Sequence, residues 1–99
     1  MAYDVIIVGN GPAGLSAALY TSRANLKTLV IGKDDGALTK ADRIENYFGM
    51  AEPISGCELV ENTKKQARTL GAELMEDEIF HISWNGGFRL EGRKGVYEA

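Results

Sequence analysis

One stretch near the start of the sequence, residues 3–25, constrains the fold more than any other. It reads YDVIIVGNGPAGLSAALYTSRAN, in which an apolar run ends at Gly9 and a helical pattern follows. Gly9, Gly11 and Gly14 have the spacing G-x-G-x-x-G, and a second apolar run, Thr28 to Ile31, comes after the helical pattern. A strand, a glycine turn, a helix and a second strand in this order predict a βαβ unit that binds a dinucleotide.

Each residue of the glycine turn has its own physical reason. Gly9 lets the chain turn sharply, and Gly11 has no Cβ to block a pyrophosphate that approaches the backbone. Gly14 allows the helix to lie close to the strand, and Pro12 stands where a backbone N–H would have no helical partner. The remaining N–H groups and the helix dipole suit a diphosphate. The alternative is a glycine-rich turn in an α/β scaffold that binds no ligand.

Composition limits the other classes of function. The chain has 99 residues, 44% of them hydrophobic, which is enough for one small globular domain of marginal stability. No apolar run approaches the roughly 18 residues that span a bilayer, and the net charge of -3 comes without a basic cluster. We therefore expect no membrane and no nucleic-acid partner. The single cysteine, Cys57, fits a reducing compartment, so we expect a cytoplasmic protein.

The end of the second predicted strand departs from a simple NAD site. An Asp or Glu about 20 residues past the glycines commonly binds the ribose hydroxyls, but Gly32 and Lys33 occupy that place. This weakens the interpretation as an NAD-binding domain. A backbone contact from these two residues to the ribose or adenine, or a phosphate contact from the lysine, is one alternative. A solvated loop charge is the other.

Residues 33–55 show no clear period and predict a long irregular connection, of a length that is often functional. Within it, residues 43–49 read RIENYFG, and their aromatic side chains either pin the loop to the core or serve a ligand. A helix over residues 56–70 follows, because Ser55 and Glu58 form a capping box and Gly71 is a typical stop. We expect its buried face to contain Leu59, Thr63, Ala67 and Leu70.

The last quarter of the chain changes to a period of two. Residues 72–76 predict a third strand, and residues 79–84, 88–91 and 95–98 predict an antiparallel meander. Cys57 and His81 have no partner in the pattern that would make a nucleophile or a metal site. We therefore assign no catalytic residue and no metal ligand to this chain.

Three motifs occur together in one order: the glycine segment continued to NLKTLVIG, then RIENYFG, then ISGCELVENTKKQARTLGAE. This combination resembles the N-terminal FAD-binding part of low-molecular-weight thioredoxin reductases, of the pyridine nucleotide-disulfide oxidoreductase family. The resemblance implies an α/β fold: a Rossmann-like FAD-binding domain with helices on one face of a parallel sheet and an antiparallel β-meander on the other. Residues 1–99 would then be part of such a domain, with the βαβ unit at 3–32, the loop at 33–55, the helix at 56–70 and the strand and meander at 72–99.

The resemblance also implies which residues meet the cofactor. The glycine turn would hold the FAD pyrophosphate, Asn46 would approach the flavin, and Ile79 or a neighbour would offer its backbone to the adenine. Ala37 stands where the family usually has a glutamine near the flavin, and Phe48 stands where it usually has a proline. Our full set of predicted cofactor-binding residues is Gly9, Gly11, Pro12, Ala13, Gly14, Gly32, Lys33, Gly36, Ala37, Leu38, Asn46 and Ile79.

In the family, electrons pass from NADPH to FAD, to a Cys-x-x-Cys pair, and on to thioredoxin or a similar disulfide protein. These 99 residues contain one cysteine and no second glycine fingerprint. We expect a truncated, FAD-binding fragment that is inactive alone and would use NADP(H) only through a domain absent from it; a homodimer is left open. The alternatives are a non-catalytic FAD- or nucleotide-binding module that acts with a partner chain, and a small NAD(P)-dependent Rossmann oxidoreductase.

Overall fold

A computed structural model describes residues 2–34 and 37–99. Its first sheet is parallel and three-stranded, in the order β1-β2-β3, and its second is antiparallel, in the order β4-β5-β6. The elements in chain order are β1 (Val5–Val8), α1 (Pro12–Arg23), β2 (Thr28–Gly32), the 3-10 helix η1 (Ala37–Lys40), α2 (Gly56–Thr69), β3 (Glu73–Glu76), β4 (Ile79–Trp84), β5 (Phe88–Gly92) and β6 (Val96–Glu98).

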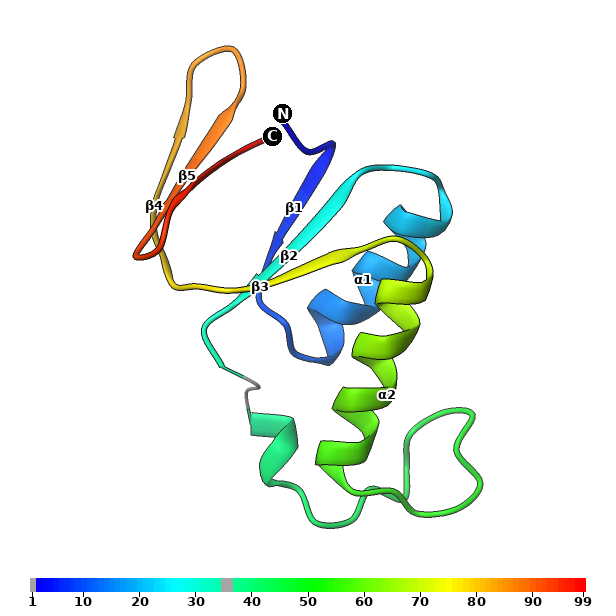
Figure 1. Ribbon diagram of the computed structural model, residues 1–99. Coiled ribbons are helices and arrows are strands. Elements are labelled where there is room, and N and C mark those ends of the chain that lie inside the picture. The colour runs from blue at the N-terminus through cyan, green and yellow to red at the C-terminus, as the bar shows by residue number, and fades with distance from the viewer. Residues whose placement is uncertain (1, 35–36) are drawn as a thin grey trace.

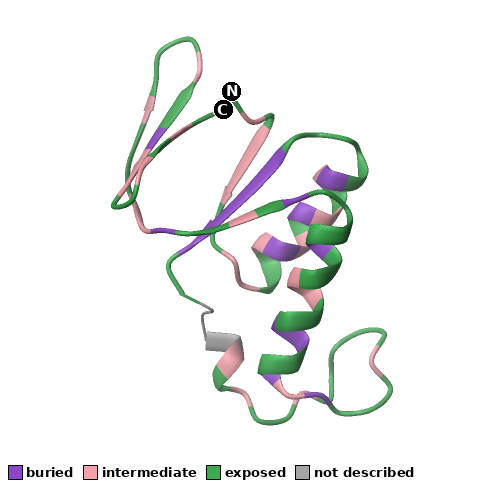
Figure 2. Ribbon diagram, viewed as in Figure 1, coloured by how far each residue is buried: buried purple, intermediate pink, exposed green. Residues whose placement is uncertain are grey.

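The two helices lie on one side of the parallel sheet, and the antiparallel sheet lies on the other side, as expected (Figure 1). The central strand β2 pairs with both β1 and β3, so all five of its residues are buried (Figure 2). On the helical side, Val30 packs with Leu15, Ala18 and Ala67 in the main apolar cluster. Small residues on both helices keep this layer thin, so that the helices lie close to the sheet.

Local geometry explains the end of α1 and confirms the predicted start and end of α2. After α1, Asn25 adopts a left-handed conformation with φ 65°, which asparagine tolerates better than most residues. The hydroxyl of Ser55 accepts a hydrogen bond from the N–H of Glu58 at 3.1 Å and caps α2. At the other end of α2, Gly71 has φ 106° and turns the chain into β3.

The predicted buried face of α2 is confirmed at Leu59 and Ala67, but Thr63 is only half-buried and Leu70 is exposed. Leu70 is 38% exposed, whereas Val60, which the spacing did not include, is 1% exposed. Leu70 occupies the C-cap position, where the chain already leaves the helix axis and turns toward β3. The buried face therefore ends at Ala67, one turn earlier than the periodicity predicts.

Asp77 joins the two sheets at the point where β3 leads into β4. Its carboxylate accepts hydrogen bonds from the Tyr97 hydroxyl at 2.7 Å and from the backbone N–H groups of Glu78 and Lys94. Burial raises the pKa of Asp77, but these bonds, with one from the N–H of Arg93, outweigh it and hold the pKa below its ordinary value. The same carboxylate raises the pKa of Tyr97 to about 12.

Candidate dinucleotide-binding site

The β1–α1 turn is built by the predicted glycines. Gly9 has φ 120°, a conformation that other residues rarely adopt, and its N–H donates to the carbonyl oxygen of Ile31 at 2.7 Å. Gly11 is the N-cap residue of α1, and Pro12 is the first helical residue. The turn is therefore held against the end of β2 while the chain reverses into the helix.

The N-terminus of α1 lacks the side-chain cap and the acidic first turn that the N-terminus of α2 has. Among the described residues, no side chain caps α1 and no acidic residue lies in its first turn, whereas Ser55 and Glu58 supply both at the start of α2. The first N–H groups of α1 and the positive end of its dipole are thus available to an anionic group. This is the arrangement that binds pyrophosphate in dinucleotide-binding folds.

The space around the glycines fits such a group. A Cβ added to Gly14 would overlap the carbonyl group of Gly9 and lie 3.3 Å from Cγ2 of Ile7, so this glycine is required for close packing of α1 on β1. A Cβ added to Gly11 would meet no atom of the residues that the structure describes within 4 Å. The protein itself therefore gives no packing reason for Gly11, and the open space beside it is where a pyrophosphate would lie.

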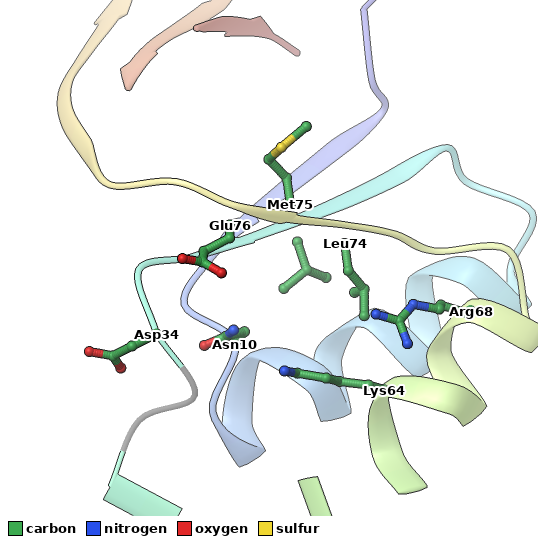
Figure 3. Close-up of a pocket in the computed structure, with 8 residues that line it drawn as sticks. Asn10, Asp34, Lys64, Arg68, Leu74, Met75 and Glu76 are labelled. Carbon is green, nitrogen blue, oxygen red and sulfur yellow. The ribbon is translucent and has the colours of Figure 1, made fainter. Parts of the chain in front are cut away.

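The structure gives a steric reason for Gly32 that the sequence did not reveal. A Cβ at Gly32 would overlap the side-chain amide of Asn10, the residue between the first two glycines. An acidic side chain at the end of β2 is therefore incompatible with the observed position of Asn10. Asn10 lies beside a cavity of about 410 Å³ at the carboxyl ends of the strands, with Glu76 of β3 and Lys64 of α2 near it (Figure 3).

The residues predicted at the adenosine end lie near one another. The N–H of Asp77 donates to the carbonyl oxygen of Gly32 at 3.0 Å, which places the start of the meander beside the end of β2. Nζ of Lys33 lies 3.9 Å from a carboxylate oxygen of Glu78, but its side chain is 69% exposed, so this surface pair contributes little stability. Ile79 begins β4 directly after this junction.

The residues predicted at the flavin end lie on the long loop. Asn46 is exposed between Ile44 and Ile54, which form an isolated antiparallel bridge, and its side chain makes no hydrogen bond to the described residues. Ala37 and Leu38 begin η1, and Gly36 lies outside the described residues. The flavin-end assignments therefore stay predictions.

Three further features of the described residues concern the cysteine, metal ligands and membrane-spanning helices. Cys57 is exposed, and its thiol donates to the carbonyl oxygen of Thr39 at 3.3 Å. Residues 2–34 and 37–99 contain no group of three or more side chains that could hold a metal ion. Neither helix described there has the length and apolar character that crossing a bilayer requires.

Known proteins resemble this chain over nearly its whole length. A thioredoxin reductase of Treponema pallidum is 50% identical over 100 residues, which cover 98% of this chain and 33% of the relative, and one of Aquifex aeolicus is 43% identical over 98 residues. The solved structure of an atypical thioredoxin reductase from Desulfovibrio vulgaris matches with a TM-score of 0.91 at 42% identity, covering 99% of this chain and 33% of that one.

A thioredoxin reductase structure from Gloeobacter violaceus gives a TM-score of 0.93 at 33% identity and covers 99% of this chain and 32% of that one. The chain thus spans about a third of the length of the relatives it matches. The family model described as pyridine nucleotide-disulphide oxidoreductase matches residues 3–94. Together with the glycine turn and the two-sheet fold, this match shows that the chain belongs to the pyridine nucleotide-disulphide oxidoreductase family.

Proposed function

We propose that this chain provides the FAD-binding cradle of a thioredoxin-reductase-type disulfide oxidoreductase. The observation that carries the proposal is the uncapped N-terminus of α1 beside the open space at Gly11. That arrangement is suited to a dinucleotide pyrophosphate, and the relatives that match the chain are thioredoxin reductases.

Different residues of the chain would contact different parts of FAD. The N–H groups that follow Gly11, at Ala13 and Gly14, would hold the pyrophosphate, and Pro12 removes an N–H that the ligand does not need. Gly32 and the start of β4 at Ile79 would face the adenosine half, because the backbone hydrogen bond from Asp77 to Gly32 places the segment that leads into β4 beside the end of β2. Asn46, on the exposed loop, would approach the flavin.

Bound FAD would supply a carrier that accepts electrons from a nicotinamide nucleotide and passes them to a disulfide. The 99 residues hold one cysteine, so a Cys-x-x-Cys pair would have to come from further polypeptide. NADPH as the donor and thioredoxin or a similar disulfide protein as the acceptor are the partners we propose for the whole assembly. The role of this chain is to bind and orient the cofactor.

A further feature supports the idea that the cradle works together with additional polypeptide. In the described residues β1 pairs only with β2, and residues of β1 help to line an apolar cleft of about 330 Å³. Val8 of β1 is 53% exposed there, and Ile82 and Phe88 of the meander line the same cleft at 53% and 50% exposure. An unpaired strand edge beside apolar side chains is typical of a packing surface. The same chain and a separate partner chain are both compatible with this feature.

Titration of the purified chain with FAD, FMN and NADH, followed by calorimetry, tests the proposal. We expect FAD to bind best, because FMN lacks the pyrophosphate and adenosine that the described site would hold. Binding should be weak if additional polypeptide completes the flavin end. Tight NADH binding without flavin binding would contradict the proposal and favour a small NAD(P)-dependent oxidoreductase. No binding by the folded chain would favour a ligand-free scaffold.

A further inference from the structure

The side-chain amide of Asn10 occupies the place that a Cβ on Gly32, at the end of β2, would take. It is half-buried, and it makes no hydrogen bond to the residues that the structure describes. A primary amide has two N–H donors and two acceptor lone pairs, so leaving all of them unused in a partly enclosed place needs an explanation. Solvent or a ligand is then the partner.

The position of this amide points to a particular ligand group. In dinucleotide-binding folds the side chain at the end of β2 binds the ribose hydroxyls of the adenosine half. Here Gly32 has no side chain, and the space that its Cβ would fill is taken by the amide of Asn10. The amide therefore stands next to the site from which an acidic residue usually reaches the ribose.

We propose that Asn10 binds the hydroxyl groups of the adenosine ribose in place of the acidic residue that position 32 lacks. This inference rests on the proposed FAD binding and deepens it. The amide oxygen would accept from one hydroxyl, and the amide N–H₂ would donate to the other. Gly32 is then a partner of Asn10, because any larger residue there would displace the amide.

The surroundings leave this contact accessible. Asn10 lines the cavity of about 410 Å³ together with Glu76 at the end of β3 and Lys64 and Arg68 of α2 (Figure 3). The cavity carries both charge signs, so it does not by itself favour an anion at this point. A neutral hydroxyl-bearing sugar is compatible with such a lining.

The test is a thermodynamic cycle that combines one change in the protein with one change in the ligand. The wild-type chain and Asn10→Ala are each titrated with FAD and with an FAD analogue whose adenosine ribose lacks both hydroxyls. For the wild type, removing both hydroxyls should weaken binding about 5- to 100-fold, the range expected for two net hydrogen bonds. For Asn10→Ala, FAD should bind as weakly as the analogue binds to the wild type, and the analogue should show no further loss.

A second pair of variants keeps the test independent of any single substitution. Gly32→Ala should weaken FAD binding by displacing the amide, and Asn10→Ala combined with Gly32→Ala should be no weaker than Asn10→Ala alone. Equal sensitivity of the wild type and Asn10→Ala to loss of the hydroxyls would overturn the inference while leaving FAD binding intact. A wild-type chain that is folded and binds neither ligand would instead refute the proposed function, and this inference with it.

Discussion

Replacing Gly14 by Ala sets two opposing effects against each other. In a helix, Gly→Ala normally stabilises by about 1 kcal/mol. Here the new Cβ would overlap the carbonyl group of Gly9 and contact Ile7, and overpacking of this kind costs about 1–3 kcal/mol. Because the obstacle is backbone in a tight turn, which moves less readily than the end of a side chain, we expect the steric cost to prevail. The variant should lose up to about 2 kcal/mol and melt up to about 8–16 °C lower.

The same shift should reduce FAD binding, since α1 must move away from β1 and carry its N–H groups with it. Urea unfolding and calorimetric FAD titration measure the two effects separately. Ala17→Gly is the matched control: Ala17 is exposed on α1, so this variant should lose about 1 kcal/mol of helix stability and keep its FAD affinity. A Gly14→Ala chain that is more stable than the wild type and binds FAD normally would refute the close-packing argument.

Three further predictions concern binding, pH and capping. Gly11→Ala should weaken FAD binding several-fold while changing stability by no more than about 1 kcal/mol, because its Cβ meets only open space; equal affinities by calorimetry would contradict a pyrophosphate beside Gly11. Folding raises the pKa of Tyr97 from 10.0 to about 12, so the hydrogen bond to Asp77 contributes fully below pH 10 and is lost as the pH rises through about 12. Urea unfolding at pH 8 and at pH 11.5 measures this loss as a decrease in the free energy of unfolding. The decrease should be larger for the wild type than for Tyr97→Phe, and equal decreases would contradict the role of this hydrogen bond. Ser55→Ala should cost about 1 kcal/mol in urea unfolding, because the hydroxyl caps α2, and an unchanged midpoint would show that the cap contributes nothing.

The parts of the fold that depend on neighbouring residues were predictable from the sequence. The helix ends at Asn25 and Gly71 follow from what these residues allow near a left-handed conformation, and the cap at Ser55 follows from its reach to the next turn. The glycine turn and the change to a period of two were equally local. The prediction that Leu70 is buried was wrong, because the spacing of apolar residues extends one turn beyond the point at which the helix ends.

Contacts between distant segments were out of reach of this reasoning. In the sequence, Asn10 is one residue between two glycines, and Gly32 stands where an acidic residue is common. Only their proximity in space shows that the amide of Asn10 occupies the place of a side chain at position 32. Asp77 stands between two glutamates in the sequence, with nothing to mark it, yet it is 4% exposed and ties two sheets together. The division into a parallel sheet and an antiparallel meander was accessible through family resemblance, but these side-chain contacts were not.

The open N-terminus of α1 also bears on how the protein persists in a cell. The first N–H groups of α1 have no side-chain cap in the described residues, so the protein should be less stable without a ligand than with one. A ligand that binds only the native state stabilises that state by RT ln(1 + [L]/Kd). On the proposed assignment, flavin supply and protein abundance would be linked. Newly made chains that fail to acquire the dinucleotide would spend more time unfolded and be degraded first, so cofactor loading would act as a form of quality control.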